Sequence, residues 1–126
     1  MTKKILIVDD EPSISNLYKD RFEYSNFEVK QAWAGETVLS MAEEFQPNVI
    51  LLDLMLPMMS GEEVLDQLKT NPKTKNISII VWTALFQQET GRNRIAKKAD
   101  DYVVKTEIKP MELVKKVEEM ISQTKK

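Results

Sequence analysis

The sequence predicts an α/β domain, a doubly wound sheet of five parallel strands with helices on both faces. Short apolar runs alternate with amphipathic segments five times along the 126 residues, and strict strand–helix alternation indicates a parallel sheet. The run Val49–Leu52 is apolar at every position, which is typical of a strand buried on both faces. No Gly-, Ser- or Pro-rich stretch divides the chain, so we expect one domain over residues 1–126.

The first half of the chain opens with a largely β-branched run at residues 5–8. A helix begins near Pro12, because the missing N–H of proline costs nothing at a helix start. Its expected buried face consists of the apolar residues Ile14, Leu17, Tyr18 and Phe22. Residues 27–33 alternate apolar with polar side chains, as an edge strand with one solvated face does. A second helix is expected over residues 36–45, before Pro47.

The second half of the chain repeats this alternation. Its expected elements are Val49–Leu52 as a strand, a helix around residues 64–68, a strand at 77–82, a helix at 87–98, a strand at 102–104 and a helix from Pro110. The helix at 87–98 has few apolar residues and contains Gly91, so we expect it to be the least stable element. Right-handed crossovers and a second strand at the edge favour the order 2-1-3-4-5, the flavodoxin-like (βα)5 arrangement.

Composition excludes several classes of function. The chain has no cysteine and no histidine, which excludes thiol catalysis, Ser–His triads and most transition-metal sites. Its apolar runs are too short to span a bilayer and its start lacks a signal peptide, so we expect a cytoplasmic protein without membrane insertion. The formal net charge of −2 provides no general attraction to nucleic acid, so we expect no direct nucleic-acid contact.

Charged and hydroxyl side chains follow four of the five expected strands. They are Asp9 and Asp10 after the first strand, Asp53 after the third, Thr83 after the fourth and Lys105 after the fifth. Ligands of doubly wound sheets bind beyond the carboxyl ends of the strands, here at the switch point between the first and third strands. Three carboxylates at that point repel one another unless a cation neutralises them, and an all-oxygen set favours Mg²⁺. An ammonium and a hydroxyl beside the metal ion predict a site for a phosphoryl group.

We expect Asp53 to be the nucleophile, because a rigid apolar strand places it and carboxylates act as covalent phosphoryl acceptors. Asp9 and Asp10 would hold the metal ion, while Thr83 and Lys105 would bind the phosphoryl oxygens. With no histidine of its own, the chain must obtain the phosphoryl group from outside. Taken singly, each of these residues is also explained by an ordinary structural role, such as an acidic helix start or a position in a solvated loop. Only the joint pattern predicts the site.

This ordered set resembles the CheY-like receiver domain of two-component response regulators. The resemblance covers essentially the whole chain and rests on ILIVDDE at residues 5–11, LDLMLPMMSG at 52–61, WTA at 82–84 and DYVVK at 101–105. It implies a regulatory domain rather than an enzyme, one that catalyses only its own phosphorylation and dephosphorylation. Asp53 would be the phosphoacceptor, and a sensor histidine kinase or phosphotransfer protein would be the donor.

The resemblance also implies a metal site and a switch. Mg²⁺ would be bound by Asp9, Asp10, Asp53 and the backbone carbonyl of Met55. Tyr102 resembles the aromatic residue that turns inward when Thr83 is drawn toward the phosphoryl group. We therefore expect phosphorylation to change the surface of the fourth helix, fifth strand and fifth helix, and so to control a downstream protein target. Met55 and Leu85 are bulky and apolar, and we expect them to shield the acyl phosphate from water.

The sequence departs from the family pattern after Lys105, where Thr106 replaces the usual proline, so the loop must be held in another way. Other classes on this fold fit less well. A flavodoxin-like cofactor site needs a Ser-, Thr- or Gly-rich loop after the first strand, and an Asp-based phosphatase needs two aspartates separated by one residue. The intact acidic site argues against a degenerate receiver that only binds partners. Residues 122–126 form a polar tail, which leaves open a free-standing regulator or a piece of a longer one.

Overall fold

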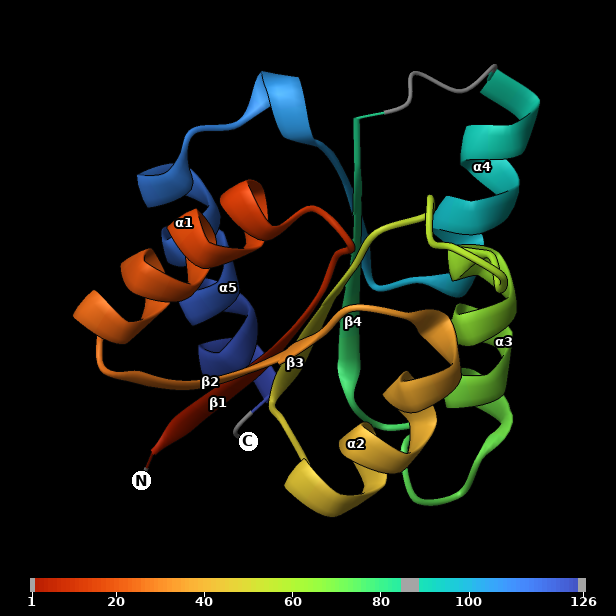
Figure 1. Ribbon diagram of the computed structural model, residues 1–126, viewed down its shortest axis with the longest axis horizontal. Helices are drawn as coiled ribbons and strands as arrows, with labels where there is room; N and C mark the ends of the chain where they lie inside the picture. The colour runs from red at the N-terminus through yellow and green to blue at the C-terminus, as the bar shows by residue number, and fades with distance from the viewer. Residues whose placement is uncertain (1, 85–88, 125–126) are drawn as a thin grey trace.

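The computed structural model describes residues 2–84 and 89–124 and has the expected architecture (Figure 1). Within these residues, five parallel strands form one sheet in the order β2-β1-β3-β4-β5, which confirms the predicted fold. The strands are β1 (Lys3–Val8), β2 (Phe27–Ala32), β3 (Val49–Leu52), β4 (Ser78–Thr83) and β5 (Asp101–Val104). The helices are α1 (Pro12–Tyr24), α2 (Val38–Phe45), α3 (Gly61–Thr70), α4 (Glu89–Lys98) and α5 (Pro110–Thr124), with 3-10 turns at Gly35–Thr37 and Lys105–Glu107.

Helices cover both faces of the sheet (Figure 1). The pair α1 and α5 lies on one face, and α2, α3 and α4 lie on the other. Along β1, Ile5 and Ile7 join the core on the α1–α5 side, whereas Leu6 and Val8 join the core on the opposite side. All four side chains are fully buried. The strand is therefore apolar at consecutive positions because both of its faces are covered.

Two local details differ from the sequence predictions. Leu17, expected on the buried face of α1, is 51% exposed, because the buried stripe of that helix consists of Ser15, Tyr18 and Phe22 and passes beside it. The second predicted helix begins instead with the 3-10 turn Gly35–Thr37 and becomes α-helical only at Val38. Residues 87 and 88 of the predicted fourth helix lie outside the described residues.

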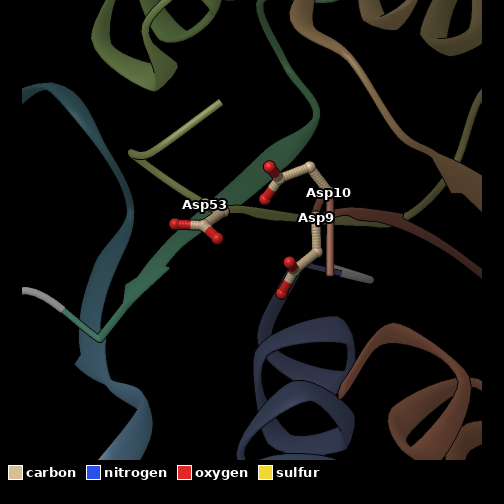
Figure 2. Close-up of side chains that lie close together, drawn as sticks. All are labelled: Asp9, Asp10 and Asp53. Carbon is tan, nitrogen blue, oxygen red and sulfur yellow. The ribbon is translucent and has the colours of Figure 1, made fainter. Parts of the chain in front are cut away.

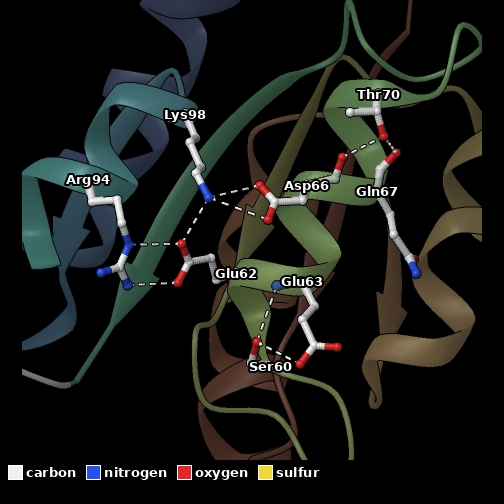
Figure 3. A network of polar contacts seen from close by, with 8 residues as sticks. All are labelled: Ser60, Glu62, Glu63, Asp66, Gln67, Thr70, Arg94 and Lys98. Carbon is white, nitrogen blue, oxygen red and sulfur yellow. Dashed lines mark hydrogen bonds and ion pairs between the residues drawn. The ribbon is translucent and has the colours of Figure 1, made fainter.

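The helix α4 is attached to α3 largely through charged side chains (Figure 3). Glu62 of α3 accepts hydrogen bonds from Arg94 at 2.9 Å and from Lys98 at 2.9 Å. Lys98 also pairs with Asp66 at 3.1 Å. Among the α4 side chains that can be described, residues 93–98, Ile95 is the buried apolar anchor. Between residues 2 and 124, outside the gap at 85–88, no helix is long and apolar enough to cross a bilayer.

Candidate functional site

The carboxyl ends of β1 and β3 lie side by side and place two aspartates next to each other. Val8 pairs with Leu52 in the sheet, and the Asp53 N–H donates to the Val8 carbonyl oxygen at 3.0 Å. The Asp9 N–H donates to the carbonyl oxygen of Ala32 in β2 at 3.1 Å. Both aspartates are buried. The sheet therefore fixes the backbone from which these two carboxylates project.

Three carboxylates gather at this edge of the sheet (Figure 2). One oxygen atom of each of Asp9, Asp10 and Asp53 lies within 4.8 Å of the others, and Asp10 is the exposed member. Burial raises the pKa of the Asp53 carboxyl above its ordinary value, and the neighbouring Asp9 charge raises it further. The structure thus brings together the three side chains that the sequence predicted as metal ligands.

Lys105 balances part of this charge. Its Nζ donates to Asp9 Oδ2 at 2.6 Å and to Asp53 Oδ2 at 3.0 Å, and its side chain is 9% exposed. Burial lowers the pKa of the Lys105 ammonium, but the hydrogen bonds and the charges of both carboxylates outweigh burial and raise that pKa above its ordinary value. When all three carboxylates are ionised, the cluster keeps two negative charges in excess, which suits a divalent cation.

Backbone N–H groups hold the other oxygen of each buried carboxylate. The Met55 N–H donates to Asp53 Oδ1 at 3.0 Å, and this bond lowers the pKa of Asp53, against the larger effect of burial. The Glu11 N–H donates to Asp9 Oδ1 at 2.9 Å. Each carboxylate is therefore held at both oxygens, by one N–H and by the Lys105 ammonium. The protein itself sets their orientation.

A pocket of about 430 Å³ lies over this cluster. Its charged lining comes from Asp10, Glu11, Asp53 and Lys105, and its apolar lining includes Met55 and Ala84. The volume is many times the ~30 Å³ that one water occupies in the liquid, so it can hold a hydrated metal ion together with a phosphoryl group. The pocket therefore gives an external ligand access to Asp53 and Lys105.

Thr83 directly precedes a residue that lines this pocket, and Tyr102 lies in the neighbouring strand β5. Thr83 ends β4 and is fully buried, while the next residue, Ala84, lines the pocket. Tyr102 in β5 is half-buried and packs against the core under α3 and α4. Neither residue is among the described residues that line the pocket. Their roles as hydroxyl ligand and switch aromatic therefore stay predictions. Leu85, the second expected shield, lies outside the described residues.

Lys105 is the first residue of the 3-10 turn Lys105–Glu107, which carries Thr106 where the family pattern has proline. This turn follows β5 directly. The part of the chain that the structure describes contains no cis peptide bond. The loop is therefore held by a tight turn that leads into the segment before α5.

Gly61 has a role at the site that the sequence alone did not indicate. A Cβ atom there would lie 2.3 Å from the Asp53 carbonyl oxygen and 2.5 Å from Leu54 Cα. The Gly61 N–H also donates to the Leu54 carbonyl oxygen at 3.0 Å. Only glycine allows α3 to begin this close to the backbone of Asp53. The N-cap Ser60, whose Oγ accepts the Glu63 N–H at 3.2 Å, was the available sequence signal for this helix start.

Fold and site together define a doubly wound α/β protein with a carboxylate–lysine cluster at the switch point of its sheet. The family described as the response regulator receiver domain matches residues 5–118. The chain therefore belongs to this family, and it is a receiver domain of phosphorelay signalling.

Relatives of known name agree with this assignment. The phosphate regulon transcriptional regulatory protein PhoB of Rhizobium meliloti is 35% identical over 125 residues, which cover 99% of this chain and 55% of that protein. The transcriptional regulatory protein SrrA of Staphylococcus aureus is 37% identical over 124 residues, 98% of this chain and 50% of that protein. The chain spans about half the length of the curated relatives it matches.

Solved structures show the same fold. A CheY-like response regulator receiver domain protein from Methanospirillum hungatei has a TM-score of 0.87 and 28% sequence identity, over 98% of this chain and 96% of that chain. The signal receiver domain of a Luxo repressor protein from Vibrio parahaemolyticus also has a TM-score of 0.87, with 27% identity over 98% of this chain and 92% of that chain.

Proposed function

We propose that Asp53 accepts a phosphoryl group from a sensor histidine kinase or phosphotransfer protein in a Mg²⁺-dependent reaction. The observation that carries this proposal is the arrangement of charge around Asp53. Its buried carboxylate lines the pocket, is held by one N–H and one ammonium, and lies beside two further carboxylates. Such a set can bind a divalent cation and can balance the charge of a transferred phosphoryl group.

Asp9, Asp10 and Asp53 fit Mg²⁺ because they offer hard oxygen ligands and an excess of two negative charges. The backbone carbonyl of Met55 would be a further ligand, since Met55 lines the pocket and its N–H already binds Asp53. When bound, the ion would neutralise the carboxylates and the phosphoryl oxygens. Its affinity is expected to rise with pH as the carboxylates lose their protons.

In the transfer step, a carboxylate oxygen of Asp53 forms a bond to phosphorus as the N–P bond of the donor phosphohistidine breaks. The electron pair of that bond stays on the imidazole nitrogen, which takes up a proton from water, and Asp53 becomes an acyl phosphate. Lys105 then donates hydrogen bonds to the phosphoryl oxygens, and the hydroxyl of Thr83 does the same after it moves toward them. Hydrolysis of the acyl phosphate restores the carboxylate.

The proposed output is a change in the surface formed by α4, β5 and α5. Tyr102 supports it, because this half-buried ring packs against the core on the side where α4 lies. The attachment of α4 through Ile95 and the ion pairs of Glu62 also supports it, since exposed ion pairs contribute little to stability. A modest free-energy difference can therefore move α4. Hydrogen exchange in α4 that is unchanged by phosphorylation would contradict this proposal.

The direct test is intact-mass measurement after incubation with Mg²⁺ and acetyl phosphate. The wild type is expected to gain one phosphoryl group, which hydroxylamine removes, while Asp53→Ala gains none. Asp20→Asn is the matched control, because Asp20 is an exposed acid on α1, and it should label like the wild type. Equal labelling of Asp53→Ala, or no labelling of the wild type by acetyl phosphate or a phosphorylated phosphotransfer protein, would overturn the proposal.

We further propose that residues 1–126 act as one receiver domain in the cytoplasm that regulates a downstream protein through protein contacts. The named relatives are transcriptional regulators of about twice this length. The net charge of −2 supports regulation through a protein surface rather than direct contact of these residues with nucleic acid.

A further inference from the structure

Trp82 lies against the site lysine. The Lys105 Nζ is 4.7 Å from the centroid of the Trp82 ring, within the roughly 6 Å over which an aromatic face attracts a cation. The same ammonium donates to Asp9 and Asp53. The Lys105 head group thus contacts two carboxylates and one aromatic face. The sequence predicted Lys105 beside the carboxylate cluster but did not indicate the aromatic contact.

The Trp82 ring is rigidly placed. It projects from β4, is fully buried, and its backbone pairs with Val103 of β5. Tyr18 of α1 packs edge-on against it, with ring centroids 4.5 Å apart and an interplanar angle of 82°. This T-shaped contact is a favourable geometry for two aromatic rings. Two different elements of the core therefore hold the face that Lys105 contacts.

Filling the core explains a large apolar side chain at residue 82 but not a buried N–H group. The buried Trp82 Nε1 has no hydrogen-bond partner among the described residues, and an unsatisfied buried donor destabilises the folded state. Leucine or phenylalanine would carry no unpaired donor, although each is smaller than the fully buried Trp82 side chain and would leave part of its space empty. An indole face, however, attracts a cation more strongly than a phenyl face does. The contact with Lys105 is therefore an interaction that favours tryptophan over leucine or phenylalanine at this position.

We propose that Trp82 is a positioning residue for phosphoryl transfer, whose indole face keeps the Lys105 ammonium at the pocket. This proposal rests on the function proposed above for Asp53. If a metal ion and a phosphoryl group bind, Asp9 and Asp53 would contact these new partners in place of Lys105. The Trp82 ring carries no charge that either ligand would compete for, so its contact with Lys105 persists through the transfer.

The contact itself is tested by NMR of the unphosphorylated wild type. Protons near the face of an indole are shifted upfield by its ring current, so the Lys105 Hε resonances are expected upfield of those of the exposed lysines. The shift should largely remain in Trp82→Phe and disappear in Trp82→Leu. Lys105 Hε resonances at ordinary positions in the wild type would overturn the proposal without any variant.

The positioning role is tested by the rate of Asp53 phosphorylation from acetyl phosphate at saturating Mg²⁺. Losing a cation–π contact of ordinary strength should slow Trp82→Leu by about five-fold, and Trp82→Phe should be slowed less. In a Lys105→Ala background, Trp82→Leu should cause no further slowing, since the group that Trp82 positions is gone. Trp33→Leu is the matched control, because Trp33 is 43% exposed, and its rate should equal that of the wild type.

The outcomes separate this proposal from the function on which it rests. If the wild type is phosphorylated and Trp82→Leu slows the reaction equally with and without Lys105, Trp82 is only a core residue and the positioning role is wrong. A Trp82→Leu rate equal to that of the wild type refutes it too. If the wild type gains no phosphoryl group, the proposed function fails and the positioning role fails with it.

Discussion

Replacing Asp53 by asparagine should stabilise the metal-free domain at neutral pH. Asp9 and Asp10 each place an oxygen within 4.8 Å of an Asp53 oxygen, and at an effective dielectric of about 20 each repels it by about 3 kcal/mol. Lys105 at 3.0 Å attracts it by about 5 kcal/mol at the same dielectric. These opposing charge effects nearly cancel, so burial, the largest cause of the raised pKa, makes the ionised Asp53 carboxylate destabilising by about 1 kcal/mol. Asparagine keeps an oxygen that can accept the Met55 N–H.

The sign of the pH dependence follows from the pKa of Asp53. Burial raises the pKa of its carboxyl above the ordinary 3.8, so the folded state binds a proton more tightly than the unfolded state. Wild-type stability therefore falls as pH rises from 3.8 through the folded-state pKa, and the loss is complete above it. The advantage of Asp53→Asn should be full above that pKa and should vanish at acidic pH.

The assay is urea unfolding with EDTA and then with Mg²⁺, followed by circular dichroism. A hundred-fold excess of Mg²⁺ over its dissociation constant should stabilise the wild type by about 2.7 kcal/mol, and Asp53→Asn should gain less because it lacks one ligand. Asp20→Asn should stay within about 0.5 kcal/mol of the wild type. A lower stability of Asp53→Asn in EDTA at neutral pH, or an equal response to Mg²⁺, would refute the reasoning.

Three further predictions concern the surroundings of the site. Gly61→Ala should lower the free energy of unfolding by about 1–3 kcal/mol, because its Cβ would lie 2.3 Å from the Asp53 carbonyl oxygen; unchanged urea unfolding would contradict this. Hydrogen bonds from Arg94 and Lys98 lower the pKa of Glu62 from 4.5 to about 2. The wild type should therefore lose a small stabilisation, absent from Glu62→Gln, as pH falls through that range, and thermal unfolding at several pH values would detect it. Met55 is 56% exposed and lines the pocket, so Met55→Ser should admit water and speed loss of the phosphoryl group several-fold, whereas decay of the label at the wild-type rate would exclude a shielding role.

The sequence was sufficient where the end of a strand and the order of the strands determine the result. Apolar runs predicted the five strands, and the acidic residues directly after two of them predicted the carboxylate cluster. This worked because parallel strands end at one edge of the sheet, so residues such as Asp9 and Asp53 must meet once the strand order is known. Lys105 follows the same rule, and its 2.6 Å bond to Asp9 joins residues 96 positions apart.

Features that depend on how the side chains of different elements pack against one another could not be predicted from one sequence. Leu17 has the spacing of a buried residue, but its exposure is set by how α1 is rotated against the sheet and α5. The need for glycine at residue 61 arises from the approach of α3 to Asp53, which no local pattern contains. The contact of Trp82 with Lys105 likewise exists only after β4 and β5 pair.

The destabilisation expected of the metal-free fold and the proposed function of the site have the same physical origin. An excess of negative charge around Asp53 is expected to destabilise the metal-free fold, and the same excess suits a divalent cation such as Mg²⁺. Additional positive side chains at the site would make the domain more stable, but they would leave less negative charge for a metal ion to neutralise. The Trp82 ring contacts Lys105 and carries no charge, so this contact leaves the net charge of the site unchanged. If Trp82 positions Lys105 as proposed, the site fixes its lysine and still keeps the negative charge that suits a divalent cation.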